Sequence, residues 1–370
     1  MAGKRNYALE KKGAPQRFDA PAIEYRPRDP KRYRARIGLI GCGGISESHL
    51  RAYKAAGYDV VALCNRTRAK AVQRQRAFYP GAAVYTDYRD VLRRDDVDVV
   101  DVTTHPAERV AILRDAIRSG KHVLSQKPFV TDLNVGERLA DLADEHGVKL
   151  AVNQNGRWAP HFSYIRQAIA RGVIGEPFAA HLGVHWDHNW VAGTPFDNVR
   201  HLVLFDFGIH WFDILSCLMG ERRPTRVFAS VAKSPSQKAR PALLGQALVE
   251  YGGAAQATIA FDADVRHGRL DETYVAGTRG TLVSSGPNLT EQSVTLHTAK
   301  GYAKPRLTGS WFGAGFHGAM AELLSAIEEK REPSNGARNN LKSLALCFAA
   351  CASADTGRPA VPGRARRIHE

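Results

Sequence analysis

The chain has 370 residues, which suits two domains better than one core, and its 44% hydrophobic and 24% charged residues are ordinary values for a globular protein. No apolar run approaches the roughly 20 residues of a membrane helix, no apolar signal segment follows the basic N-terminus, and the five scattered cysteines fit reduced thiols, so we expect a cytoplasmic protein with no membrane partner. The net charge of +15 lies largely in residues 1–36 and 358–367, as basic arms that are usually solvated or packed on a neighbouring subunit, so we expect no nucleic-acid partner.

The first predicted element is a strand, glycine turn and helix beginning at RIGLIGCGGIS (36–46). Gly41 allows the chain to turn sharply, and Gly43 allows the backbone to approach a pyrophosphate bound at the N-terminus of the helix. Ser46 stands where a third glycine is usual and is small enough for close packing. A glycine-rich turn alone also fits an ordinary loop, so the interpretation depends on the strands and helices after residue 46. The residues expected to contact the cofactor here are Gly41, Gly43, Gly44 and Ile45.

Strands and helices then alternate as far as His146. The predicted strands are 59–65, 97–104 and 121–125, and the predicted helices are one ending at Phe78, 107–119 and 133–146. This alternation predicts an α/β fold whose first domain is a Rossmann, doubly wound parallel sheet that binds ligand at the carboxyl ends of its strands.

The end of the second strand indicates which dinucleotide is bound. An acidic residue usually grips the ribose of NAD there, but this chain has Asn65, Arg66, Thr67 and Arg68. Guanidinium groups would hold the 2′-phosphate of NADP, and the run resembles the Asn-Arg-Thr clamp of shikimate dehydrogenases. Arg66 and Arg68 equally fit the start of a solvated helix, so we predict NAD(P) with a slight preference for NADP.

The segment KHVLSQKPF (121–129) resembles the glucose-fructose oxidoreductase and inositol dehydrogenase (Gfo/Idh/MocA) family, whose members carry Gly-Lys-His-Val followed by Glu-Lys-Pro. The resemblance implies that Lys127 lies beside the nicotinamide ribose and the substrate hydroxyl, with a cis peptide bond before Pro128. Gln126 replaces the family's acid, which removes a charge partner of the lysine, and the resemblance implies that Gln126 and Lys127 both contact the cofactor.

Two further segments resemble family motifs around the cofactor and substrate. Thr103 matches the first residue of a Thr-Pro-Asn-x-x-His loop that lies at the nicotinamide, while His105 equally fits a helix cap. VNQNGRWAP (152–160) resembles an Asn-x-Arg-Phe/Tyr-x-Pro junction. This second match implies that Asn155 and Arg157 lie between the lobes and bind substrate.

The segment LFDFGIHWFDIL (204–215) resembles the family's Asp-x-Gly-x-His-x-x-Asp helix start. A helix beginning here sets Asp206 and His210 on one face. Removal of hydride from an alcohol carbon needs a base, and neutral imidazole is suited to that role, so His210 is the candidate base. Asp206 would orient the imidazole or a substrate hydroxyl, and Lys127 would stabilise negative charge on oxygen. A single histidine among aromatic residues is more often a core residue, but the joint match favours catalysis, and we expect Asp213 to cap the chain locally.

The segment GVHWDHNW (183–190) is a second polar cluster. His185 and Trp190 are candidate substrate contacts, because an indole ring can stack on a sugar. Histidines and a carboxylate at alternate positions without a separated third donor make a poor zinc signature, so we predict no metal site.

Alternating apolar segments after residue 224 predict a second, α+β domain with a large, mostly antiparallel open sheet. The resemblance implies helices on one face of this sheet and subunit contacts on the other, hence a homodimer or homotetramer. The expected division is a basic arm (1–35), an NAD(P)-binding domain (36–155), a substrate and oligomerisation domain with closing helices (156–359) and a basic tail (360–370).

The predicted function is NAD(P)-dependent hydride transfer to or from a hydroxyl or keto carbon of a sugar, a sugar derivative or a cyclitol. Two alternatives stay open. One is a glycosidase that uses a retained NAD for transient oxidation, and the other is a cofactor sensor that has lost the chemistry.

Overall fold

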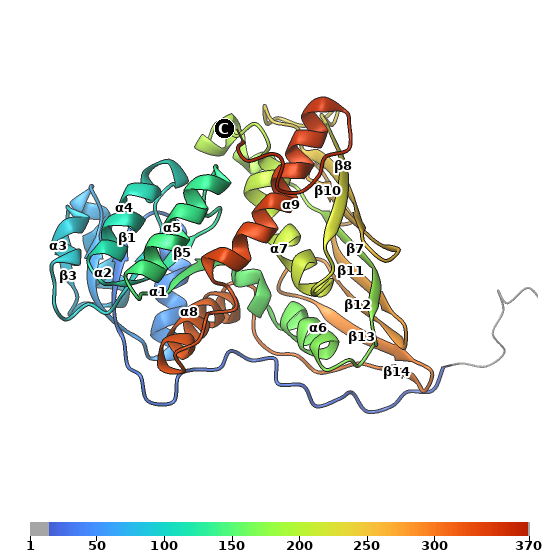
Figure 1. Ribbon diagram of the computed structural model, residues 1–370, viewed down its shortest axis with the longest axis horizontal. Coiled ribbons are helices and arrows are strands. Elements are labelled where there is room, and N and C mark those ends of the chain that lie inside the picture. The colour runs from blue at the N-terminus through green and yellow to red at the C-terminus, as the bar shows by residue number, and fades with distance from the viewer. Residues whose placement is uncertain (1–14, 369–370) are drawn as a thin grey trace, which may run out of the picture.

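The computed structural model describes residues 15–368, which fold into two lobes that are each built on one β-sheet (Figure 1). The first lobe has six parallel strands in the order β3-β2-β1-β4-β5-β6. They are β1 (Arg36–Ile40), β2 (Asp59–Cys64), β3 (Ala83–Tyr85), β4 (Val99–Val102), β5 (His122–Gln126) and β6 (Leu150–Asn153). The strand order reverses between β1 and β4, which is where doubly wound sheets bind their ligands. The predicted Rossmann sheet is confirmed.

Helices cover both faces of this sheet, which explains why its strands are apolar throughout. The helices of the first lobe are α1 (Ser46–Ala56), α2 (Arg68–Phe78), α3 (Tyr88–Leu92), α4 (Pro106–Arg118) and α5 (Leu133–Glu145). Ile37 and Leu39 belong to one apolar cluster with α1 and α2, whereas Ile40 belongs to the cluster on the opposite face. The short elements β3 and α3 were not predicted, because three and five residues are too few to establish a period.

The second lobe is an eight-stranded sheet in the order β14-β13-β12-β11-β7-β10-β9-β8. Its strands are β7 (Pro177–His185), β8 (Pro224–Ala232), β9 (Leu244–Tyr251), β10 (Ala255–Asp262), β11 (Leu270–Gly277), β12 (Gly280–Gly286), β13 (Ser293–Thr298) and β14 (Gly301–Ala303). All neighbours pair antiparallel except β7 and β10, which are parallel, so the mostly antiparallel sheet is confirmed.

One face of the second sheet is covered by helices and the other is bare (Figure 1). The helices outside the first lobe's sequence are α6 (Pro160–Ala170), α7 (Ile209–Leu218), α8 (Gly313–Glu328) and α9 (Ala337–Thr356), and the short turns are η1 (Asn155–Trp158), η2 (Asn189–Val191), η3 (Pro195–Asn198) and the π-helical η4 (Leu202–Phe207). On the bare face Phe228, Leu248 and Tyr274 are at least 36% exposed. Helix α8 packs against α1, and α9 packs against α5, α7 and β8, so the closing helices join the two lobes.

The described part of the N-terminal arm runs along the outside of both lobes (Figure 1). Residues 1–14 of the predicted arm lie outside the described residues. Phe18 donates its backbone N–H to Tyr302 of β14 at 2.9 Å, and further along the arm three backbone N–H groups donate to the carboxylate of Glu328 at the end of α8. The described part of the C-terminal tail returns to the start of α5, where Arg367 pairs with Asp132. No helix within residues 15–368 is long and apolar enough to cross a membrane.

Candidate active site

The glycine turn between β1 and α1 has the geometry that a bound pyrophosphate needs. Gly41 has φ +107°, and a Cβ on this residue would lie 3.0 Å from Thr103 Oγ1 and from the backbone nitrogen of Thr104. At Gly43 and Gly44 a Cβ would meet no atom within 4 Å, so the turn opens onto free space at the N-terminus of α1. This combination fits a dinucleotide, because an anion is favoured at a helix N-terminus and the backbone is free to approach it.

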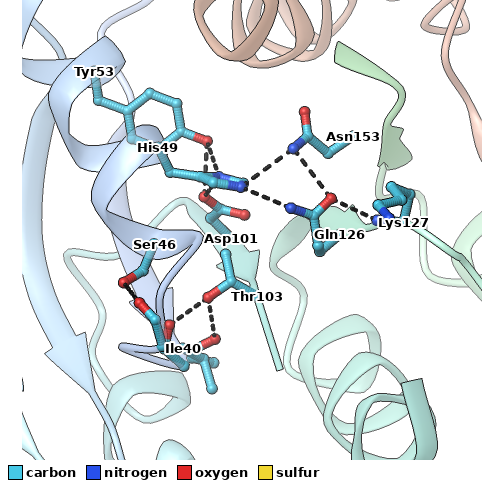
Figure 2. Close-up of polar contacts among 11 residues, drawn as sticks. Ile40, Ser46, His49, Tyr53, Asp101, Thr103, Gln126, Lys127 and Asn153 are labelled. Carbon is cyan, nitrogen blue, oxygen red and sulfur yellow. Dashed lines mark hydrogen bonds and ion pairs between the residues drawn. The ribbon is translucent and has the colours of Figure 1, made fainter. Parts of the chain in front are cut away.

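Side chains around the turn hold it in this shape. The Thr103 hydroxyl donates to the carbonyl oxygen of Gly41, and Ser46, which is fully buried, donates to that of Gly43 at 2.6 Å (Figure 2). Asn65 Oδ1 accepts the N–H of Cys42 at 3.0 Å. Thr103 and Asn65 therefore use their side chains to join the ends of β4 and β2 to the glycine turn.

The two arginines after β2 lie on the surface. Arg66, whose side chain is 83% exposed, forms an ion pair with Glu108 at 2.7 Å, and Arg68 donates to the carbonyl oxygen of Val84 at 3.4 Å. His105 caps α4, since its Nδ1 accepts the N–H of Ala107 at 3.4 Å. The capping role for His105 is thus the one that the geometry supports.

Lys127 makes a polar contact between the two lobes. It follows the last residue of β5, and the Lys127–Pro128 peptide bond is cis. Its Nζ donates to the backbone carbonyl oxygen of Asp206 at 2.7 Å and lies 3.5 Å from the carboxylate Oδ2 of the same residue. The two side chains are 18% and 14% exposed, so this contact is largely shielded from solvent. The structure therefore brings together two motifs that are 79 residues apart in the chain.

His210 lies in the first turn of α7 and is half-buried. Burial, and then the nearby charge of Lys127, lower the pKa of His210 well below its ordinary value, so the imidazole is neutral near pH 7. Its buried Nδ1 has no hydrogen-bond partner among the described residues. A neutral imidazole can accept a proton from a substrate hydroxyl, here through the ring nitrogen that is not buried. Within the described chain the polar contacts of Asp206 are with Lys127, and none of them orients His210.

A fully buried polar group lies behind Lys127, in the first lobe (Figure 2). Asp101 of β4 accepts a hydrogen bond from the Tyr53 hydroxyl at 2.8 Å, and its Oδ2 lies 2.7 Å from Nδ1 of His49 in α1. All three side chains are 0% exposed. A carboxylate accepts hydrogen bonds, so Nδ1 of His49 carries the hydrogen and Nε2 carries the lone pair.

Gln126 connects this group to the lysine (Figure 2). Its Nε2 lies 3.2 Å from Nε2 of His49, and its Oε1 accepts the backbone N–H of Lys127 at 2.7 Å. Asn153 of β6 also presents its amide nitrogen to His49 at 3.2 Å. Gln126 was expected to contact the cofactor, but its side chain is 6% exposed and is directed into this network.

Arg109 forms hydrogen bonds with the backbone on either side of Lys127. Its buried guanidinium donates to the carbonyl oxygens of Gln126 and Pro128 and to that of Thr104. Sequence reasoning missed this residue, and it missed His49 and Asp101 as well. A charged residue on an otherwise apolar face was the signal in the sequence that could have found two of them. Asp101 interrupts a buried strand, and Arg109 shares the inner face of α4 with Ile112, Leu113 and Ala116.

Arg157 and Asn155 lie in η1, which follows the last strand of the first lobe, and their buried side chains are occupied by other groups of the protein. Arg157 is 2% exposed and forms two hydrogen bonds of 2.6 Å with the Asp213 carboxylate. Burial is the largest influence and acts to lower the pKa of Arg157, but the charge and hydrogen bonds of Asp213, together with Cys217 and Glu322, outweigh it and the net shift is upward. Asn155 donates to the carbonyl oxygen of Trp311 at 3.2 Å. This corrects two expectations: the Arg157 guanidinium faces a buried carboxylate instead of substrate, and Asp213 is its partner instead of a local cap.

The segment from His185 to Trp190 divides between two surfaces. His185, at the end of β7, forms a 2.8 Å contact with Asp262 and lies beside Glu272 on the bare face of the second sheet, away from Lys127 and Asp206, which corrects its expected contact with substrate. Trp190 is 57% exposed, and its ring centroid lies 5.7 Å from that of Phe196 and 6.2 Å from that of Phe207. Because Phe207 follows Asp206 directly, this second, aromatic surface adjoins the contact between Asp206 and Lys127.

A glycine turn that fits a dinucleotide, together with a lysine and a neutral histidine, defines a nicotinamide-dependent oxidoreductase. A family model described as an oxidoreductase family with an NAD-binding Rossmann fold matches residues 35–154, and a model of the GFO/IDH/MocA C-terminal domain matches residues 162–283. The chain therefore belongs to the Gfo/Idh/MocA oxidoreductase family, which confirms the resemblance seen in the sequence.

Individual relatives agree with this assignment. The chain is 28% identical to D-apiose dehydrogenase of Paraburkholderia graminis, over 86% of this chain and 88% of that protein. It is 30% identical to 1,5-anhydro-D-fructose reductase of Ensifer adhaerens, over 88% of this chain and 98% of that protein. A crystal structure of an oxidoreductase from Agrobacterium radiobacter with NAD+, L-tartaric acid and magnesium matches with a TM-score of 0.79 at 21% identity, over 90% of this chain and 99% of that one. These relatives are dehydrogenases and reductases, and they give no support to the glycosidase alternative.

Proposed function

We propose that the protein catalyses reversible hydride transfer between the nicotinamide of bound NAD(P) and a hydroxyl- or keto-bearing carbon of a sugar, a sugar derivative or a cyclitol. The observation that carries the proposal is the contact of Lys127 with Asp206, which sets the end of β5 beside the first turn of α7 and its histidine. The names of the two curated relatives, which act on apiose and anhydrofructose, support a sugar-like substrate.

The cofactor would be held by the glycine turn and α1, and when bound its nicotinamide supplies the hydride acceptor. Lys127 Nζ donates a hydrogen bond to the substrate oxygen that becomes a carbonyl, which stabilises the negative charge that develops there. His210 accepts the hydroxyl proton on its accessible ring nitrogen, since its lowered pKa keeps it unprotonated at neutral pH. Asp206 holds the lysine ammonium at the cleft and leaves it further N–H donors for substrate.

The substrate ring would rest on the exposed aromatic surface beside Asp206. Trp190 provides an apolar ring face that is 57% exposed. Carbohydrate rings present C–H groups on one face, so an indole ring is complementary to them.

The adenosine end of the cofactor would lie beside Asn65, Arg66 and Arg68. No acid follows β2 to repel a 2′-phosphate, and both guanidinium groups are on the surface, so we propose a modest preference for NADP. The ion pair of Arg66 with Glu108 opposes this preference, because the arginine must exchange one anion for another. Replacing both arginines with alanine should raise the KM for NADP about tenfold and leave the KM for NAD within about twofold.

The bare face of the second sheet is the surface that we propose for assembly of two or four copies in the cytoplasm. Its exposed Phe228, Leu248 and Tyr274 come from three different strands. Light scattering on the purified protein tests this point, and a Tyr274→Lys variant should shift the mass toward the monomer.

A cofactor-reduction screen tests the activity. Sugars, cyclitols and their glycosides are incubated with NAD and with NADP in parallel, and the absorbance of reduced nicotinamide is followed. We expect reduced cofactor to accumulate with at least one polyol, in an amount proportional to the polyol added. Reduction by none of them, combined with no measurable affinity for either dinucleotide, would contradict the proposal.

A further inference from the structure

The polar network behind Lys127 has one direction of hydrogen bonding, and Asp101 sets it. Its Oδ2 accepts from the Tyr53 hydroxyl and from Nδ1 of His49, at 2.8 and 2.7 Å. With the hydrogen on Nδ1, the opposite nitrogen of the imidazole is an acceptor. Burial of all three side chains leaves no solvent to reverse this arrangement.

The acceptor nitrogen of His49 determines how the Gln126 amide is oriented. Gln126 turns its NH2 group toward His49 Nε2, which leaves its carbonyl oxygen to hold the backbone N–H of Lys127 at 2.7 Å. Asn153 supplies a second amide nitrogen to the same histidine and also donates to Gln126 Oε1 at 3.3 Å. The amide is therefore fixed from both of its ends.

We propose that Gln126 is a positioning residue for Lys127, and that His49 and Asp101 orient its amide for this purpose. Position 126 needs a side chain that donates to a neutral imidazole and accepts from a backbone N–H at the same time. Glutamine does both, whereas a carboxylate would place a lone pair against the lone pair of His49. That the positioned lysine is catalytic rests on the function proposed above.

The consequence for Lys127 is a backbone held at three points. Gln126 Oε1 holds its own N–H, and Arg109 holds the carbonyl oxygens of Gln126 and Pro128. The Nζ atom is thereby aimed at the carbonyl of Asp206 on the other lobe. Because His49 lies on α1, the helix that follows the glycine turn, the network also joins the dinucleotide-binding turn to the catalytic strand.

The test is a Gln126→Glu variant of the full chain, compared with the wild type across pH. The variant can restore its hydrogen bonds only if His49 takes up a second proton and lies as an imidazolium between two carboxylates. The extra proton is bound at low pH and is released as the pH rises, so the hydrogen bonds that the variant regains at low pH are lost again at high pH. We expect the variant-to-wild-type ratio of kcat/KM to fall about tenfold or more between pH 6 and pH 9, with the loss in kcat. The relative free energy of unfolding should decline over the same range.

A second substitution supplies the matched control. In the double variant His49→Gln with Gln126→Glu, the amide at position 49 donates to the new carboxylate without titrating. The ratio to wild type should then be independent of pH, and kcat should exceed that of Gln126→Glu at pH 9. A nitrogen NMR titration of the His49 ring should show imidazolium in Gln126→Glu at pH 6 and a neutral ring in the wild type.

The outcomes separate this proposal from the function on which it rests. The orienting role of His49 is overturned if the variant-to-wild-type ratio of kcat/KM and the relative free energy of unfolding both stay constant with pH. A pH-dependent unfolding ratio combined with a flat kcat/KM ratio overturns the role of Gln126 in positioning the lysine. If the wild type turns over no substrate, the proposed function fails, but the unfolding and NMR measurements still decide whether His49 sets the amide.

Discussion

Lys127 and His210 lie near each other on opposite lobes, but they are held in different ways. The lysine is held by its side chain, its own backbone and the carbonyls of its neighbours. The histidine is packed against Trp311, with a ring-centroid distance of 5.3 Å, and its buried Nδ1 has no partner among residues 15–368. One side of the site is therefore held by hydrogen bonds before ligand arrives, whereas the other side has a neutral group that is held by packing alone.

The largest effect should come from the organised side. Replacing Lys127 with alanine removes the cation that stabilises charge on the reacting oxygen, and kcat/KM should fall by about 10³-fold or more. The measurement is the rate of cofactor reduction at saturating dinucleotide, with circular dichroism to show that the variant is folded.

Lys121 offers the matched control, because it precedes β5 at the opposite end of the same strand and donates to the carbonyl of Arg94. Lys121→Ala should keep kcat/KM within about threefold of wild type, as expected for a surface substitution. Equal losses in the two alanine variants would show that Lys127 acts through the stability of β5 and not through chemistry.

The next largest effect concerns the buried ion pair that joins η1 to α7. Arg157→Met leaves the Asp213 carboxylate buried without its partner and should destabilise the fold by about 3–5 kcal/mol. Urea unfolding measures the loss. The double variant with Asp213→Leu should recover most of it, because no buried charge then remains unpaired.

The size of the loss for Arg157→Met also tests where the Arg157 side chain lies. A loss below about 1 kcal/mol for the single variant would place Arg157 nearer to solvent than its 2% exposure indicates, and would make it a candidate substrate contact again.

A smaller effect, the pH dependence of kcat/KM, distinguishes the role of His210 from that of Lys127. Since burial lowers its pKa, His210 should stay unprotonated as the pH falls through 6.5, its ordinary value, so kcat/KM should hold at pH 6.5 and decline only at more acidic pH. His210→Gln should lower kcat by about 10²-fold and abolish this acid limb. An acid limb centred above pH 6.5 in the wild type, or one that persists in the variant, would assign the titration to another group.

The sequence was sufficient for the order of the longer strands and helices of the first lobe. The glycine turn and the alternating elements depend on local patterns, which a single sequence contains. The role of Arg157 could not be predicted in this way, because its partner Asp213 lies 56 residues away and only tertiary packing brings the two together. Gln126 was interpreted as the loss of an acid, since nothing near it in the chain reveals that His49 faces its amide.

The central claim is that the glycine turn and the pair of Lys127 and His210 serve one bound dinucleotide and one substrate. A crystal structure with NAD(P)+ and a polyol from the screen tests it most directly. We predict the pyrophosphate at Gly43 and the reacting hydroxyl about 3 Å from both Lys127 Nζ and a ring nitrogen of His210. A dinucleotide bound away from the turn, or a substrate carbon beyond the reach of both side chains, would contradict this claim.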